Sequence, residues 1–257
     1  DELGELARAF DRMRERLARL DDARREFIAN ASHELRTPLF SLGGSLELLL
    51  EEDMDDETRR EFLTTMREQV ERLAKLATEL LDLSRLDAGR LHVEREPVAL
   101  RSVADAVANE FRAVAQTRDH VLEAPATGDA FALADADRVL QIGRILVENA
   151  LVHTPPGTTV RLSVGFDATT ATLSVEDDGP GIPSEHANHV FDRFYRIDGA
   201  KASGSGLGLA IARELARLMG GTIEVESRHG RTEFRLGLPR AAPADGRDAR
   251  DLDAVAV

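Results

Sequence analysis

A histidine able to do phosphoryl chemistry stands in the string HELRTP, residues 33–38 of this 257-residue chain. A neutral imidazole is a nucleophile toward phosphorus near pH 7 when its second ring nitrogen can share its proton. Glu34 can accept that proton, and Thr37 lies one helical turn after His33, where its hydroxyl can position a water. Pro38 removes a backbone donor, so we expect a kink there. A lone histidine is more often a solvated surface residue, so this string needs support from elsewhere.

A second set of polar side chains lies on a predicted helix that ends at His153-Thr154-Pro155. Asn149 offers a carboxamide oxygen, which Mg²⁺ accepts as a ligand, and Glu148 beside it can act as a base or through a metal-bound water. The plainer interpretation of this string is a polar helix face.

The string DDGPGIP begins at Asp177, directly after an apolar strand. Gly179 and Gly181 would allow a ligand to approach the backbone closely. Taken alone, the string is more typical of a tight acidic turn.

Two further strings are suited to phosphates. FDRFYR carries Arg193 and Arg196 beside Phe191, whose ring equally fits a hydrophobic core. GSGLGLA, beginning at Gly204, opens a helix, where backbone N–H groups bind anions. It matches neither a P-loop nor a dinucleotide-binding fingerprint.

Together these strings resemble the two-component sensor histidine kinases, from Asp1 to about Arg240. HELRTP is similar to their phosphoacceptor motif, and the later strings are similar to the N box, D-x-G-x-G loop, F-x-x-F element and glycine loop of GHKL ATPases. The resemblance implies ATP and Mg²⁺ as cofactors and phosphorylation of His33, assisted by Glu34. It also implies that Thr37 supports dephosphorylation of a partner and that Asp177 accepts a hydrogen bond from adenine. The implied metal ligands are Asn149 and Glu148, and the implied nucleotide-binding residues are Asn149, His153, Asp177, Gly179, Gly181, Phe191, Arg193, Arg196, Gly204, Gly206, Leu207 and Gly208, with a lid over 197–203.

The chain departs from the family pattern at two positions of the N box. Ile145 stands where the family often has Asn, and Val152 stands where it often has Lys. Losing an oxygen ligand and a cation weakens the expected binding of Mg·ATP. Arg144 can compensate, although its side chain is turned about 100° around the helix from position 145.

The elements that position these residues fall into two halves. Apolar residues at steps of three and four predict one helix through residue 50 and a second from about 58 to 87, joined by an acidic connection over 51–57. Two such helices cannot bury both apolar stripes alone, which predicts a homodimer built on a four-helix bundle.

From about residue 91 the pattern changes to short alternating strands and three longer helices. Strands are expected over 91–100, 121–126, 129–135, 160–166, 171–175, 222–227 and 232–239, with helices over 103–115, 135–151 and 210–219. This order predicts an α+β sandwich of the GHKL (Bergerat) type, with helices on one face of a mixed sheet.

The expected domains are the end of a HAMP linker over 1–22, a dimerisation and phosphotransfer domain over 23–90, a catalytic domain over 91–240 and a disordered tail over 241–257. DELGELARAF resembles a HAMP end, and the chain starts without Met, so we expect the cytoplasmic part of a bacterial membrane receptor. The membrane would then be reached only through an upstream segment, because no run of about 18 apolar residues occurs.

Composition argues against some classes of partner and of chemistry. A net charge of −14 argues against a nucleic-acid partner, and the absence of cysteine excludes thiol catalysis and disulfides. The expected partner is a response-regulator receiver domain. Two alternatives stay open: a GHKL ATPase that forms no phosphohistidine, and a degenerate kinase that acts mainly as a phosphatase or scaffold.

Overall fold

The computed structural model describes residues 2–51, 54–125, 128–197 and 204–242. The chain divides into two compact units, Asp1–Leu81 and Asp82–Val257. The predicted lid over 197–203, apart from Ile197, and the predicted tail from residue 243 lie outside the described residues.

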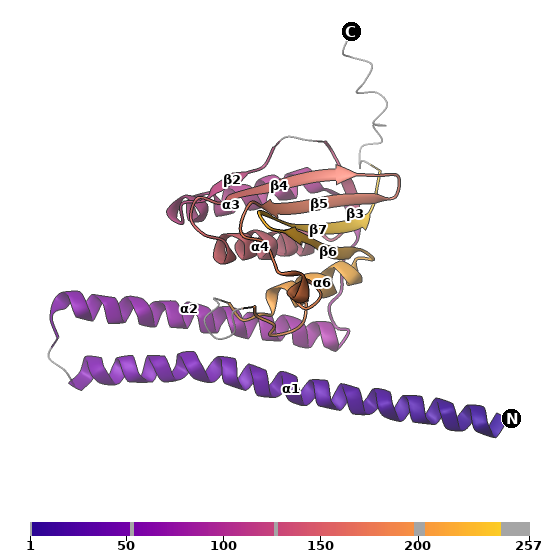
Figure 1. Ribbon diagram of the computed structural model, residues 1–257, viewed down its shortest axis with the longest axis horizontal. Helices are drawn as coiled ribbons and strands as arrows, with labels where there is room; N and C mark the ends of the chain where they lie inside the picture. Colours follow the sequence, from indigo (N-terminus) through magenta and orange to yellow (C-terminus); the bar gives the residue numbers. More distant parts are fainter. Residues whose placement is uncertain (1, 52–53, 126–127, 198–203, 243–257) are drawn as a thin grey trace, which may run out of the picture. The chain divides into compact units, whose positions relative to one another are not determined.

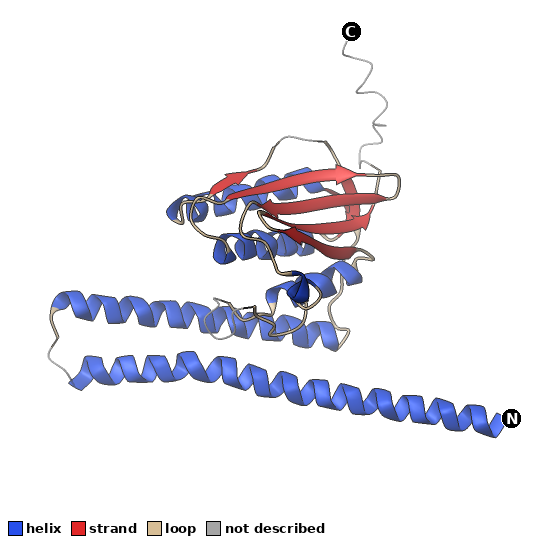
Figure 2. Ribbon diagram, viewed as in Figure 1, coloured by secondary structure: helices blue, strands red, loops and turns tan. Residues whose placement is uncertain are grey.

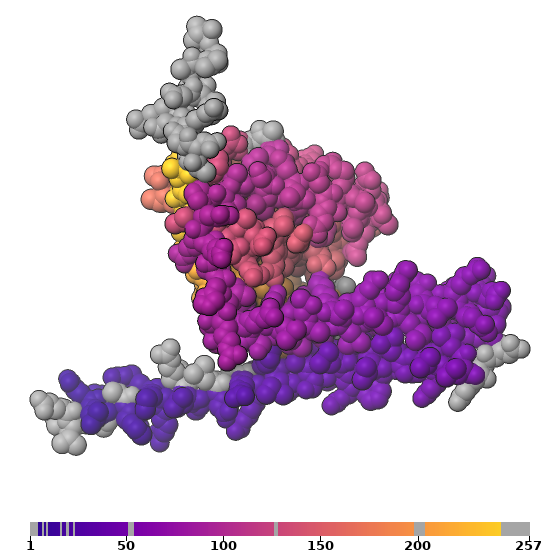
Figure 3. Space-filling view, turned by 180° about the vertical axis from the view of Figure 1, so that it is seen from behind, coloured from indigo at the N-terminus to yellow at the C-terminus, as the bar shows by residue number. Residues whose placement is uncertain are grey.

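The first unit is a helical hairpin (Figure 1). Helix α1 covers Glu2–Glu51 and helix α2 covers Asp56–Asp87, and both views of the molecule show them side by side (Figures 1 and 3). Helix α1 continues through Pro38 without ending, although a proline removes one helical hydrogen bond. The acidic connection is shorter than predicted, because Asp55 accepts a hydrogen bond from the N–H of Thr58 (2.7 Å) and so starts α2 early.

Helix α2 stops where its sequence predicts. Gly89 has a positive φ of 61°, and Arg90 N–H and Gly89 N–H donate to the carbonyls of Arg85 and Leu86, both at 3.0 Å. This pair of bonds closes the helix as a Schellman motif, for which glycine is the favoured residue.

Large apolar side chains stay exposed along both helices of this unit. Within a single chain they have no core to enter, which is the pattern that led us to predict a dimer. The exposed set includes Phe10, Leu17, Leu35, Leu39, Phe40, Leu46, Leu50, Leu63 and Val70.

The second unit contains seven strands and four helices within the described residues (Figure 2). In chain order they are β1 (Glu96–Ala99), α3 (Leu100–Thr117), β2 (Val121–Glu123), β3 (Phe131–Ala134), α4 (Ala136–His153), β4 (Thr159–Phe166), β5 (Thr170–Asp177), α5 (Ser184–Ala187), α6 (Gly208–Leu218), β6 (Thr222–Arg228) and β7 (Arg231–Pro239).

Five strands form a mixed sheet in the order β2-β4-β5-β7-β6, with β2 parallel to β4 and the other pairs antiparallel. Strands β1 and β3 form a separate antiparallel pair. Helices α3, α4 and α6 lie on one side of the main sheet, as Figure 2 shows. Alternate strand residues such as Leu162, Leu173 and Leu236 are fully buried, as an α+β sandwich with one covered face requires.

Two local predictions were wrong. Residues 91–95 do not join a strand, because Glu94 N–H donates to Asp135 (3.2 Å) and the Arg95 guanidinium donates to the Leu218 carbonyl, so side chains rather than a ladder hold this segment. The short helix α5 was also not predicted, since four residues are too few to show a helical period.

Candidate functional site

The predicted phosphoacceptor string lies on the surface of α1. His33 is exposed, and the Thr37 hydroxyl donates to the His33 carbonyl (3.3 Å) one turn earlier. The Glu34 carboxylate forms an ion pair with Arg72 of α2 (3.5 Å). The histidine is therefore accessible, while its neighbouring carboxylate is shared with a cation.

Asp177 is the buried carboxylate of the second unit. It ends β5, is 6% exposed, and accepts a hydrogen bond from the N–H of Gly179 (3.0 Å). Burial disfavours the charged form and raises the pKa of Asp177 to about 6, although the Gly179 N–H acts in the opposite direction. A buried carboxylate kept near neutrality is poised to exchange hydrogen bonds with a polar ligand.

The two glycines after Asp177 are required by close packing. A Cβ at Gly179 would lie 2.7 Å from the Thr154 methyl and 2.8 Å from Asp177 Oδ1. Gly181 has a φ of 85°, and a Cβ there would lie 2.3 Å from the Arg228 carbonyl oxygen. This loop therefore touches both the end of α4 and the β6–β7 turn.

Helix α4 presents the predicted N-box residues, and α4 packs against α6 (Figure 1). Glu148 and Asn149 are half-buried, whereas His153 is exposed in the last turn. A Cβ at Gly208, the first residue of α6, would lie 3.2 Å from the Ile145 side chain. The glycine loop is thus brought beside the N box, and an apolar Ile145 forms part of that contact.

Arg144 is paired on the surface, away from position 145. Its guanidinium pairs with Glu110 of α3 (2.8 Å) on the surface. The one-residue offset turns the side chain to a different neighbour, and compensation by Arg144 stays a prediction.

The FDRFYR segment has mixed roles. Phe191 is buried and packs edge-on against Phe234 at 6.1 Å between ring centroids, so it belongs to the core. Arg193 is bonded to Asp87 through two hydrogen bonds, at 2.8 and 2.6 Å. Arg196 is half-buried. The core interpretation of Phe191 is confirmed, and the phosphate role of both arginines stays a prediction.

The glycine loop closes onto the same segment. Phe194 N–H donates to the Gly206 carbonyl (2.9 Å), and a Cβ at Gly206 would lie 2.8 Å from the Phe194 carbonyl carbon. Gly206 has a φ of 72° and Gly204 of 101°, while Leu207 is fully buried as an anchor. The backbone of this loop therefore stays close to the start of the predicted lid.

Comparison with known proteins identifies both units. Residues 23–89 match the His Kinase A (phospho-acceptor) domain, and residues 134–242 match the histidine kinase-, DNA gyrase B- and HSP90-like ATPase domain. The probable sensor histidine kinase TcrY of Mycobacterium tuberculosis is 38% identical over 248 residues, covering 93% of this chain and 52% of the relative. The chain belongs to the two-component sensor histidine kinases.

Other sensor kinases agree with this membership. The histidine kinase WalK of Bacillus subtilis is 35% identical over 86% of this chain and 37% of its own length, and BaeS of Escherichia coli is 33% identical over 93% and 52%. The chain spans about half the length, or less, of these curated relatives. HAMP-like character over 1–22 stays a prediction.

Solved structures of sensor histidine kinases share the fold. Full-length ShkA in complex with AMPPNP has a TM-score of 0.64 and 28% identity, covering 85% of this chain and 46% of ShkA. The histidine kinase ThkA in complex with the response regulator TrrA has a TM-score of 0.72, covering 91% of this chain and 65% of ThkA. At 24% identity the second likeness concerns the fold alone.

Sequence reasoning missed two buried polar residues of this chain, Thr232 and His120, and the half-buried Thr154. Thr232 on β7 is paired in register with Asp177 and is buried, with its hydroxyl 3.1 Å from that of Ser227. Strand alternation alone could have placed Thr232 inside, but only the register puts it beside the carboxylate. No local signal marks Thr154 and His120, whose side chains meet across 34 residues of the chain.

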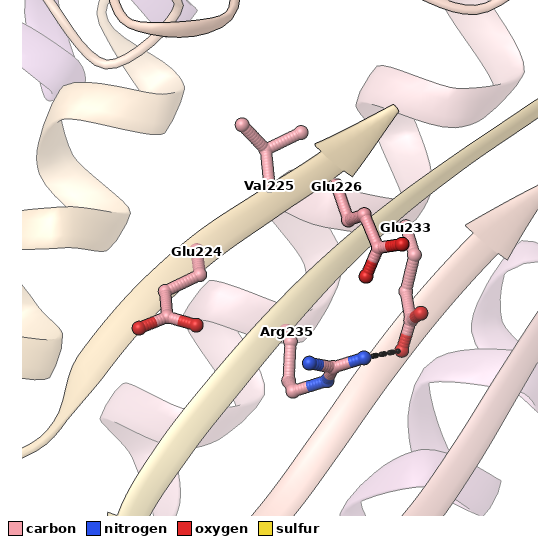
Figure 4. Close-up of a pocket in the computed structure, with 5 residues that line it drawn as sticks. All are labelled: Glu224, Val225, Glu226, Glu233 and Arg235. Atoms are coloured by element: carbon pink, nitrogen blue, oxygen red, sulfur yellow. Dashed lines mark hydrogen bonds and ion pairs between the residues drawn. The ribbon is translucent and has the colours of Figure 1, made fainter. Parts of the chain in front are cut away.

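A surface hollow of this kinase lies apart from the predicted site. It is lined by Glu224, Glu226, Glu233 and Arg235, with Val225 at its edge (Figure 4). Phe234 is buried in the core, so its strand neighbours Glu233 and Arg235 face the opposite side of the sheet. Glu233 is buried and is satisfied by Arg231 (2.8 Å) and Arg235 (3.0 Å), which indicates a structural ion-pair network.

The described residues can bind a magnesium ion only together with the phosphates of a nucleotide. They contain no group of three or more His, Cys, Asp or Glu side chains able to hold a metal. Asn149 and Glu148 therefore provide too few ligands for a protein-only site, and Mg²⁺ usually completes its shell with substrate phosphates and waters. Within the described residues no helix has the length and apolar character needed to cross a membrane.

Proposed function

We propose that this kinase transfers the γ-phosphoryl group of ATP to His33 and then passes it to an aspartate of a response-regulator receiver domain. The observation that supports this most strongly is that one chain carries both matched domains. An exposed histidine stands in the phospho-acceptor match, and a buried carboxylate followed by two tightly packed glycines stands in the ATPase match.

Within the nucleotide site, Asp177 would accept a hydrogen bond from the adenine amino group. The loop from Gly204 to Gly208 would offer backbone N–H groups to the phosphates at the start of α6. Asn149 and Glu148 would hold Mg²⁺, which offsets phosphate charge when bound. Arg196 and His153 would contact phosphate, as would Arg193 after leaving Asp87.

In the transfer step, a ring nitrogen of His33 forms a bond to the γ-phosphorus while the bond to the β,γ-bridging oxygen breaks. ADP leaves with that electron pair. Glu34 takes the proton from the other ring nitrogen, which keeps the phosphorylated imidazole neutral at that position. The ion pair with Arg72 orients the Glu34 carboxylate for this task.

Dimerisation and phosphotransfer complete the proposal. The exposed apolar side chains of α1 and α2 support a homodimer with a four-helix core. ThkA, a kinase of the same fold, forms a complex with the response regulator TrrA, which supports a receiver domain as the partner of this kinase. We place the chain on the cytoplasmic side of a bacterial membrane receptor, with the signal entering through α1.

Incubation of the purified chain with γ-labelled ATP and Mg²⁺, followed by addition of candidate receiver domains, tests the proposal. We expect label on the chain first and then on one receiver domain. ATP hydrolysis without labelled chain would instead support a GHKL ATPase. Failure to bind Mg·ATP would support the degenerate kinase, for which Ile145 and Val152 are the reason.

A further inference from the structure

His120 is a buried histidine that the proposed chemistry does not use. It is 7% exposed and lies between the end of α3 and strand β2. Its Nδ1 lies 2.8 Å from the Arg118 carbonyl, and its Nε2 lies 2.9 Å from the Thr154 hydroxyl. Both ring nitrogens are therefore occupied inside the protein.

A backbone turn directs this histidine inward. Helix α3 ends in a Schellman motif, with His120 N–H donating to the Ala115 carbonyl (2.8 Å) and Asp119 N–H to the Gln116 carbonyl (3.1 Å). Asp119 takes the left-handed position with a φ of 57°, where glycine is the usual residue. The chain thus accepts a strained non-glycine turn directly before the buried imidazole.

Residues 119–121 form hydrogen bonds with the loop that follows α4, residues 154–158. The Asp119 carbonyl accepts from Gly157 N–H (2.6 Å), and Val121 N–H donates to the Thr158 carbonyl (3.0 Å). Between these two backbone bonds, His120 reaches the Thr154 side chain. The segment 119–121 therefore holds both ends of the loop 154–158.

The same loop supports the Asp177 loop. The methyl of Thr154 fills the space where Gly179 would carry a Cβ. Asp178 N–H donates to the Thr159 carbonyl (3.2 Å), and Thr159 N–H donates to the Asp178 carboxylate (2.7 Å). A displacement of Thr154 would therefore move Gly179 and disturb the hydrogen bond from its N–H to Asp177.

We propose that His120 is a positioning residue of the nucleotide site, acting through Thr154 on the loop that carries Asp177 and Gly179. His120 bonds to Arg118 and Thr154, neither of which is a predicted ligand-binding residue. Its contribution is to hold the Thr154 side chain in the one place that lets Gly179 N–H meet the Asp177 carboxylate. This inference rests on the proposed ATP-binding function and assigns it a residue outside the family motifs.

The two ring nitrogens of His120 have different parts in this cluster. Nδ1–H donates to the Arg118 carbonyl, because a carbonyl oxygen only accepts, and Nε2 forms the bond to the Thr154 hydroxyl. That hydroxyl also donates to the Ala150 carbonyl (2.7 Å), so the Thr154 side chain joins the end of α4 to the imidazole. Removing Nε2 takes away the side-chain bond that ties Thr154 to the segment 119–121.

A matched pair of variants separates the two ring nitrogens. His120→Gln can place an amide where Nε2 reaches Thr154, whereas His120→Asn can replace only the bond of Nδ1. We expect the dissociation constant of Mg·AMPPNP to rise about five- to tenfold in His120→Asn and to stay within about twofold of the parent in His120→Gln. Labelling of His33 at saturating ATP should keep its rate in both, so the change appears in KM and not in kcat.

Thr154 provides a second, independent pair. Thr154→Val keeps the methyl and loses the hydroxyl, and should weaken Mg·AMPPNP binding as His120→Asn does. The double variant should be no weaker than either single variant, because both remove the same bond. If His120→Asn fails to fold, Thr154→Val against the parent still tests the bond, because it keeps the methyl beside Gly179 and loses only the hydroxyl.

Hydrogen exchange in the nucleotide-free protein tests the bonds between the segment 119–121 and the loop 154–158 without any nucleotide. Amides of Gly157, Thr158 and Gly179 should exchange faster in His120→Asn than in the parent and His120→Gln. Parent-like binding and exchange in His120→Asn would overturn the inference, as would an equal loss in both histidine variants. A parent that binds no AMPPNP would contradict the proposed function. The difference in exchange between His120→Asn and the parent would still test the bonds between the segment 119–121 and the loop 154–158.

Discussion

The guanidinium of Arg193 and the carboxylate of Asp87 form a two-pronged ion pair across 106 positions of the chain, at 2.8 and 2.6 Å. Asp87 is the last residue of α2, where the helix dipole disfavours an anion, and Arg193 lies in the segment that leads to the predicted lid. The pairing raises the pKa of Arg193, mainly through its hydrogen bonds to Asp87. This pair ties the end of α2 to the FDRFYR segment.

Arg193→Gln and Asp87→Asn should each destabilise the second unit, with a coupling of about 0.5–1 kcal/mol, because both side chains are partly solvated. A double-mutant cycle in urea would measure the coupling. The exposed pair Arg217–Glu214, at 3.4 Å, is the control and should couple more weakly. Equal coupling in the two pairs would show that the two-pronged geometry adds nothing.

The raised pKa of Asp177 predicts a pH dependence of nucleotide affinity. Only the ionised carboxylate has both lone pairs of each oxygen free to accept the adenine amino group, so affinity should fall as pH drops through about 6. At pH 5 the parent should bind Mg·AMPPNP about tenfold more weakly than at pH 8. Asp177→Asn has no carboxyl group to titrate. After correction for the titration of the nucleotide phosphates, which affects both proteins alike, its affinity for Mg·AMPPNP should not change with pH.

The same shift predicts the pH dependence of stability in the absence of nucleotide. A carboxyl pKa that is higher in the folded than in the unfolded chain means that the folded state holds more protons between about pH 4 and 6. This group therefore favours folding at low pH, and that contribution is lost as pH rises through 6. Nucleotide-free Asp177→Asn should gain stability on the order of 2 kcal/mol over the parent at pH 8, and no gain at pH 4.

Gly206→Ala should disable the glycine loop. The new Cβ would lie within 3 Å of three backbone atoms of the FDRFYR segment, at a φ of 72° that L side chains rarely adopt. We expect at least a tenfold loss of Mg·AMPPNP affinity by calorimetry. Gly165→Ala is the control, since its Cβ would meet nothing within 4 Å, and it should bind as the parent does.

Thr37→Ala should leave phosphorylation of His33 within about twofold of the parent and slow the decay of the phosphorylated receiver domain at least tenfold. The Thr37 hydroxyl bonds weakly to the His33 carbonyl at 3.3 Å, so it is free to turn toward a water. Thr37→Ser keeps the hydroxyl and should retain the decay rate. Unchanged decay in Thr37→Ala would exclude this role.

Sequence patterns predicted the parts of the fold that depend on local chemistry. The strands β4 and β5, the end of α2 and the mixed sheet covered by helices follow from alternation and helical period. Asp177 and Gly179 could be chosen because their string resembles the D-x-G-x-G loop of GHKL ATPases. His120, Thr232 and the Arg193–Asp87 pair could not be found this way, since their partners lie 34, 55 and 106 residues away in the sequence and only the tertiary fold brings them together.

The most direct test of the central proposal is the position of the phosphoryl group after reaction with Mg·ATP. The chain should be labelled, digested at alkaline pH to preserve a phosphoramidate, and mapped by mass spectrometry, with His33→Gln treated in parallel. We predict an acid-labile phosphate on the peptide that carries His33 and none on the His33→Gln chain. Label that persists in His33→Gln, or that maps to another residue, would contradict the proposal.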